Sequence, residues 1–152
     1  MKTLKLNAPI ETLDIEIGGT VVSAFIDATA DNLLSLADAC GKAEKEMGNI
    51  SAMQRRAQAE RDFPMLRKLN KGAADAMEPA IRTAIGDEAY DAVVKACGAG
   101  RAVPKESCNV VMVKILEAIA ETVREQQIVE EGKAAHYLAE VEDAQTEPYT
   151  MQ

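Results

Sequence analysis

The sequence predicts an α+β protein, mostly helical, in which an N-terminal β-hairpin precedes a bundle of four to five helices. The hydrophobic period changes from two before Asp27 to about 3.6 after it. Of the 152 residues 47% are hydrophobic but only 3% are aromatic, which favours close helix packing. The length suits one domain over residues 1–142, with the hairpin at about 2–27 and the helices at about 29–142. Residues 143–152 are expected to form a flexible acidic tail.

Alternating apolar and polar residues predict the strands. The alternation runs over residues 2–6 and 13–17, and β-branched residues follow Gly18 and Gly19. Two glycines accept the positive φ of a two-residue turn, so residues 11–26 are expected to pair, and a first strand before Pro9 makes two or three strands. Because a two-stranded ribbon is marginal alone, it must add the strand at 2–6, lie on the helices, or pair with another subunit.

The first two helices are expected to follow the hairpin directly. Thr29 or Asp31 is the candidate N-cap of the first, and apolar residues then recur at helical spacing. Its end stays open, because Gly48 offers a stop while the Ala-rich stretch 51–60 would carry the helix onward. The second helix is expected to start at Asp62. Pro79 predicts a kink or a break in it.

Two further helices and a weaker one complete the expected bundle. Gly86 marks a boundary between helices, and Gly98 and Pro104 close the short helix that follows. The strongest period of 3.6 lies at about 107–127 and predicts the central helix of the core. Its predicted apolar face holds Val110, Val113, Leu116, Ile119, Ala120 and Val123. A weaker helix is expected at about 133–142.

Residue chemistry indicates no catalytic, metal or cofactor site. Cys40, Cys97 and Cys108 form no CxxC pair, so we expect Cys40 and Cys97 to be small hydrophobic residues on helices. The only histidine, His136, lies four residues before Glu140, without a third ligand at metal-binding spacing. We therefore expect a protein that is not an enzyme. A small hydrolase that combines His136 with a cysteine is the alternative.

Charge and hydropathy bear on partners and location. The chain has 25 acidic and 17 basic residues, a net charge of −8, which disfavours nucleic acid and anionic membranes as partners. The N-terminal residues lack the apolar run of a signal peptide, and the longest apolar runs are interrupted by Lys114 and Glu117. A cytoplasmic protein is expected.

The charge is unevenly distributed along the chain. Six bases face two acids between Ser51 and Lys71, a local balance of about +4. From Glu117 onward nine acids meet only Arg124 and Lys133. This asymmetry favours docking against a charged protein partner or self-association, with solvated helix faces as the alternative. Methionines in the same region would fill the core or form an adaptable apolar surface. The candidate contacts are Met47, Met53, Arg55, Arg56, Arg61, Met65, Leu66, Arg67, Lys68 and Lys71.

Three stretches of the chain resemble the small tail assembly chaperones of long-tailed phages and prophages of Gram-positive bacteria. They are TLKLNAPIETLDIEIGGTVVSAFI, DNLLSLADACGKAEKE and AIGDEAYDAVVKACGAGRAVPKESCNVVMVKILEAIAETV. The resemblance covers roughly residues 2–127. The family usually has an aromatic residue where this chain has Ile85, and the stretch 51–60 has no counterpart.

The resemblance implies a non-enzymatic protein of the host cell cytoplasm. Such a protein would bind the long, apolar tape-measure protein until tail-tube subunits polymerise around it, so the tail-tube protein is a further expected partner. A homo-oligomer is also expected, because the hairpin is marginal alone. The alternative from another class is a structural tail or connector subunit of the particle that acts by subunit–subunit pairing.

Overall fold

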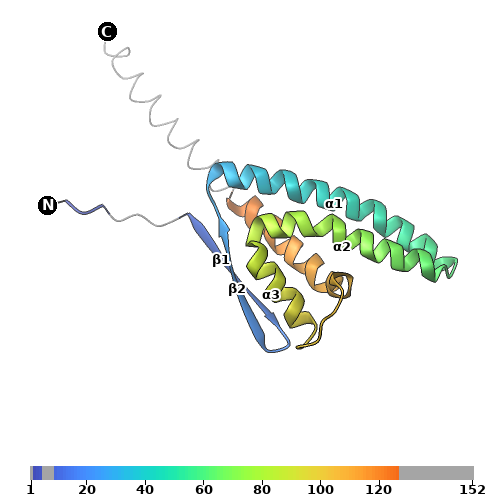
Figure 1. Ribbon diagram of the computed structural model, residues 1–152. Coiled ribbons are helices and arrows are strands. Elements are labelled where there is room, and N and C mark those ends of the chain that lie inside the picture. The colour runs from blue at the N-terminus through green and yellow to red at the C-terminus, as the bar shows by residue number, and fades with distance from the viewer. Residues whose placement is uncertain (1, 5–8, 127–152) are drawn as a thin grey trace, which may run out of the picture.

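The fold is known from a computed structural model, which describes residues 2–4 and 9–126. Its elements are, in chain order, β1 (Ile10–Ile17), β2 (Thr20–Asp27), α1 (Ala30–Ala59), α2 (Phe63–Ile85), α3 (Asp87–Cys97), the 3-10 turn η1 (Lys105–Cys108) and a helix over residues 109–126. The hairpin lies along one side of the helices (Figure 1). The predicted α+β class, mostly helical with an N-terminal hairpin, is confirmed. The helix expected at 133–142 and the tail at 143–152 lie outside the described residues.

The hairpin β1–β2 forms around its two glycines. Ile17 pairs with Thr20, and Gly18 and Gly19 between them have φ of 55° and 85°. One face of the sheet is apolar and packs on the helices, through Leu13, Ile15, Ile17, Val22, Ala24 and Ile26. Of the three arrangements open to the hairpin, the structure therefore shows packing on helices. Residues 2–4 belong to no strand, and the rest of the segment expected to form a first strand lies outside the described residues.

Helices α1 and α2 form an antiparallel pair joined at residues 60–62. Thr29 is the N-cap of α1, and the helix continues through Gly48 to Ala59. Asp62 caps α2, because its carboxylate accepts a hydrogen bond from the Met65 backbone N–H at 3.2 Å. The sequence predicts a kink or a break at Pro79, and of these the break is wrong, since α2 runs on to Ile85. Buried residues on both sides of this exposed proline hold the helix in the core, and their packing outweighs one lost hydrogen bond.

A charged cluster ties α3 and η1 to α2. The Arg82 guanidinium lies 4.2 Å above the Tyr90 ring and forms ion pairs with Asp87 at 3.0 Å and Asp91 at 3.1 Å. Lys105 of η1 forms two ion pairs with α2, one with Glu78 at 3.4 Å and one with Asp75. Gly86, with φ of 87°, ends α2 and precedes α3, as the sequence predicts.

The helix over residues 109–126 is central to the core, but its predicted face is rotated. Its buried residues are Met112, Ile115, Leu116, Ile119, Ala120 and Val123. Val110, predicted to be buried, is 74% exposed, and Val113 is only partly buried. Val110 lies two residues before Met112, about 200° away around the helix, so it cannot share a face with it. Cys108 extends the buried face into η1.

Candidate functional site

The paired ends of α1 and α2 project beyond the rest of the protein (Figure 1). We call residues 51–71, at the end of this projection, the basic arm. The main hydrophobic core includes no residue between Met47 and Met77. Inside the arm the helices are held by smaller contacts, with Ala57 and Leu69 buried and a hydrogen bond of 3.0 Å between the Gln54 and Asn70 side chains. The arm is therefore a separate surface, and it contributes little to the core.

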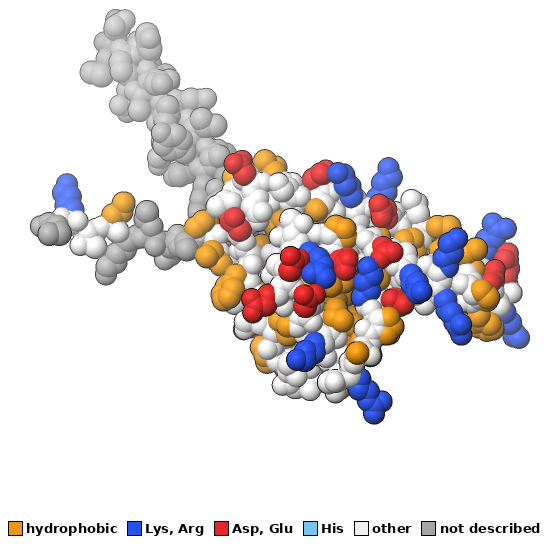
Figure 2. Space-filling model, in the orientation of Figure 1, with side chains coloured by type: hydrophobic (Ala, Val, Ile, Leu, Met, Phe, Trp, Pro, Cys, Tyr) orange, Lys and Arg blue, Asp and Glu red, His pale blue; other side chains and the backbone are white. Residues whose placement is uncertain are grey.

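All six bases of the arm are exposed. Figure 2 shows Lys and Arg side chains gathered over this end of the protein. Within the described part of the chain only one of the six, Arg56, pairs with a carboxylate, at 3.2 Å from Glu60. Both members of that pair are well exposed, so it neutralises little of the local field. The arm is a cationic surface on a protein whose net charge is −8.

Apolar side chains lie among these cations. Met53, Phe63 and Met65 are 49%, 63% and 42% exposed. Met53 and Met65 line a hollow of about 300 Å³ at the tip, together with Arg56, Ala57, Glu60 and Asp62. Flexible thioethers adapt to varied apolar surfaces, and exposed apolar groups with a charged rim mark protein interaction sites. The tip therefore combines an apolar hollow with a charged rim.

The connection at the tip places an arginine where helices usually have glycine. Arg61 has φ of 54°, the left-handed conformation of the residue after a helix C-cap. The Asp62 N–H donates to the Ala57 carbonyl at 2.8 Å, and the Arg61 N–H donates to the Gln58 carbonyl at 3.2 Å, which completes a Schellman motif. A residue with a Cβ costs roughly 1 kcal/mol or more here, so the chain keeps a cation at the tip at the expense of stability.

The structure brings together every predicted contact residue except one. Met53, Arg55, Arg56, Arg61, Met65, Leu66, Arg67, Lys68 and Lys71 all lie on the arm. Met47 instead packs against the main core, because it continues the face of α1 that covers Met77 and Leu116. Phe63, which is not among the predicted contacts, is also exposed on the arm. Its position in the sequence indicates that it is exposed. Phe63 directly follows the N-cap Asp62 and lies beyond the end of α1, so no turn of α1 lies opposite its ring to cover it.

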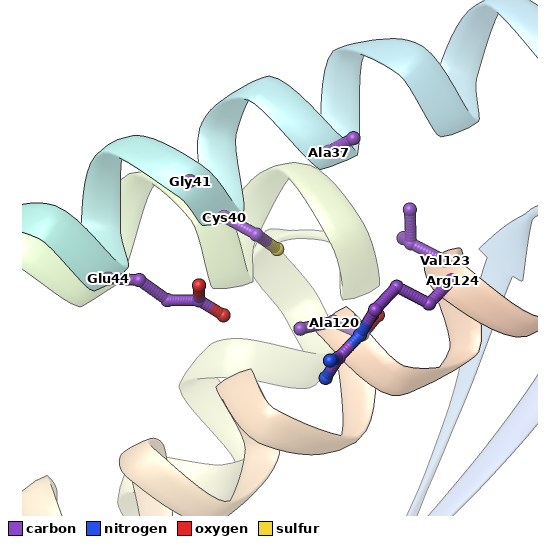
Figure 3. Close-up of a pocket in the computed structure, with 7 residues that line it drawn as sticks. All are labelled: Ala37, Cys40, Gly41, Glu44, Ala120, Val123 and Arg124. Carbon is purple, nitrogen blue, oxygen red and sulfur yellow. The ribbon is translucent and has the colours of Figure 1, made fainter.

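A second hollow, of about 170 Å³, lies between α1 and the helix over residues 109–126 (Figure 3). Cys40, Glu44 and Arg124 are its chemically distinctive residues. Burial raises the pKa of the Cys40 thiol, and the Glu44 carboxylate raises it further. Burial and a hydrogen bond with Cys97 raise the pKa of Cys108 to about 12. Neither thiol supplies the thiolate that nucleophilic catalysis requires near neutral pH.

Within residues 2–4 and 9–126 no group of three or more His, Cys, Asp or Glu side chains could hold a metal ion. None of the described helices is both long enough and apolar enough to cross a membrane. His136, around which a hydrolase site was the alternative, lies outside the described residues.

Comparison of the chain with protein-family models, with curated proteins and with solved structures found no match.

Proposed function

We propose that this protein is a phage or prophage tail assembly chaperone that holds a segment of the tape-measure protein on its basic arm until the tail tube assembles. It acts in the host cell cytoplasm by binding alone and without catalysis. The observation that carries the proposal is the arm itself, an exposed projection that combines six cations with Met53, Phe63 and Met65. The sequence resemblance is the basis for proposing the tape-measure protein as the partner, and the exposed side chains of the arm are the basis for the proposed contact.

The arm suits a long apolar helical partner in three respects. Its exposed methionines adapt to different side chains, so successive segments of one partner can occupy the same hollow. Its cations select segments whose apolar face is flanked by acidic residues, and they speed the encounter. The acidic remainder of the protein keeps a covered partner in solution through net charge. Several weak contacts along a long partner also allow displacement by tail-tube subunits.

Co-expression with the tape-measure protein encoded in the same genome tests the proposal. We expect this protein to raise the soluble fraction of the tape-measure protein. The charge-reversal variant Arg55→Glu/Lys71→Glu and the apolar variant Met53→Ser/Met65→Ser should each lose that effect, with helix content by circular dichroism unchanged. The proposal is contradicted if the soluble fraction of the tape-measure protein is the same with and without the wild-type chain.

Matched controls separate the arm from the rest of the surface. Lys45→Glu/Lys95→Glu makes the same change in net charge at two exposed bases outside the arm. Leu34→Ser/Val110→Ser removes two exposed apolar side chains elsewhere. Both controls should retain full activity. Equal losses in controls and arm variants would show that the arm is not the contact surface.

A second candidate is a structural tail or connector subunit that acts by pairing with other subunits. Among the residues that the structure describes, β1 pairs only with β2, and its other edge favours this candidate because such an edge accepts a strand from another chain. Mass spectrometry of purified particles separates the two candidates, since a chaperone is absent from mature particles and a structural subunit is present in fixed copy number.

A further inference from the structure

The hairpin presents an open edge along β1. Within residues 2–4 and 9–126, β1 hydrogen-bonds only to β2, so the backbone groups on its other edge have no partner strand. The eight pairs from Ile10–Asp27 to Ile17–Thr20 follow without a bulge, and β1 has no internal Pro. Its charged side chains are all acidic, Glu11, Asp14 and Glu16, so they oppose an acidic strand and favour one with a basic residue on the same face. Such an edge is a template for β-augmentation, in which an extended segment adds a further strand.

An apolar groove runs beside this open edge. It has a volume of about 340 Å³ and lies between β1 and the helix over residues 109–126. Its apolar lining consists of Leu13, Ile15, Ile17, Val111, Ile115 and Ala118, and Asp14, Glu16 and Lys114 also border it. A strand added to β1 would therefore bury apolar side chains on its inner face, which backbone hydrogen bonds alone would not achieve.

We propose that residues 2–6 of a second copy of this protein pair with β1 and fill this groove, which makes the protein a strand-exchanged dimer. The segment has the pattern that the site requires. Leu4 and Leu6 point to one face of an extended chain, and Lys5 points to the other. Leu4 is 82% exposed in the single copy.

Both faces of the added strand then find complementary partners. Leu4 and Leu6 enter the groove on the face that holds Ile15. Lys5 lies on the outer face of the sheet, where Asp14 and Glu16 are exposed. Same-face neighbours on adjacent strands interact directly, and opposite charges there are stabilising. A shift by one residue would bury Lys5 in the groove, so the pattern also selects the register.

A hairpin return within one chain would not bring residues 2–6 of the same copy into this groove. The Ala28 N–H donates to the Pro9 carbonyl at 2.7 Å, so Pro9 already extends the hairpin ladder. The tightest return within one chain would turn at residues 7 and 8, which places Leu6 opposite Pro9 and Leu4 opposite Glu11. Both leucines would then fall short of the groove, which begins at Leu13. If residues 2–6 fill the groove, they therefore come from another copy, and reciprocal exchange closes a two-fold dimer.

The oligomeric state of the full-length protein tests the proposal. Light scattering coupled to size exclusion should give a dimer, and Leu4→Glu/Leu6→Glu should raise its dissociation constant by about a hundredfold or more, because two buried leucines are lost. The control Leu34→Glu, at an exposed leucine of α1, should remain dimeric. A monomeric wild type, or a dimer indifferent to Leu4→Glu/Leu6→Glu, would overturn the proposal.

A charge swap and a photo-crosslink locate the contact. Lys5→Glu should weaken the dimer about tenfold or less, and adding Glu16→Lys should restore it. A photo-crosslinking residue at position 4 of the full chain, in a mixture of isotopically light and heavy protein, should join light to heavy chains at residues 111–118. Crosslinks confined to one isotope, or joined mainly to the basic arm, would refute a strand exchanged at β1. The proposed chaperone activity does not depend on this result, because the arm variants test it separately.

Discussion

Replacement of Gly98 by alanine should destabilise the protein strongly, although the change adds a single methyl group. Gly98 follows α3 and begins the connection to η1, and its φ of −81° is ordinary for any residue. The obstacle is space, because a Cβ at this position would lie 2.1 Å from the Arg101 carbonyl oxygen, whereas ordinary contact begins at 3.4 Å. Val103 Cγ2 would lie 3.3 Å away, which is also closer than ordinary contact.

The expected cost follows from what must move. The Arg101 N–H donates to the Gly98 carbonyl at 3.0 Å, and the turn must open to admit the methyl group, which loses about 1 kcal/mol for that bond. The connection cannot move freely, because Lys105 is held by ion pairs to α2 and Cys108 is buried in the core. A forced backbone shift adds about 1–3 kcal/mol. Gly98→Ala should therefore cost about 2–4 kcal/mol.

Urea unfolding followed by circular dichroism at the helix band measures this cost. Gly48→Ala is the matched control, since Gly48 lies inside α1 with no atom within 4 Å of an added Cβ. It should stabilise the protein by about 0.5–1 kcal/mol, because alanine is the better helix former. Replacement of glycine by alanine should thus lower the free energy of unfolding at position 98 and raise it at position 48. A Gly98→Ala variant as stable as the wild type would refute the reasoning about the turn.

Four further changes test other parts of the structure. Arg61→Gly should raise the free energy of unfolding by about 1 kcal/mol in urea titrations, because glycine accepts the left-handed φ at the arm tip. Ile119→Ala should lower it by about 3 kcal/mol, since a fully buried side chain leaves a cavity. Arg82→Met should lower the free energy of unfolding by roughly 1–2 kcal/mol, because the variant loses the ion pairs of Arg82 and its contact with Tyr90. In 1 M salt the difference in stability between wild type and variant should be smaller, since salt screens the ion pairs. The Cys108 thiol holds its proton more tightly in the folded chain than in the unfolded one, so the free energy of unfolding should fall as pH rises from 9.0 towards about 12. Over the same pH range the urea midpoint of Cys108→Ala should fall less than that of the wild type.

Most residues of the candidate site could be predicted, because the basic arm is one continuous stretch of the sequence. Six bases within 21 residues stand out in an acidic chain, and consecutive residues in two adjoining helices must end up close together. Met47 packs against the main core and lies apart from the other predicted contacts, which helical spacing could not foresee because it gives a position on a face and not the neighbour that covers the face. The groove beside β1 could not be foreseen, since residues 13–17 and 111–118 meet only in three dimensions.

The sequence by itself determined the features that depend on a few neighbouring residues. The turn at Gly18 and Gly19, the cap at Asp62 and the boundary at Gly86 follow from backbone preferences and local hydrogen bonds, which act over four or five positions.

Only the tertiary structure decided which faces are covered. It carried α2 through Pro79, rotated the buried face of the helix over residues 109–126 away from Val110, and left the arm without a partner in the core. These outcomes depend on burial against residues far away in the chain, and burial contributes more free energy than the local preference it overrides.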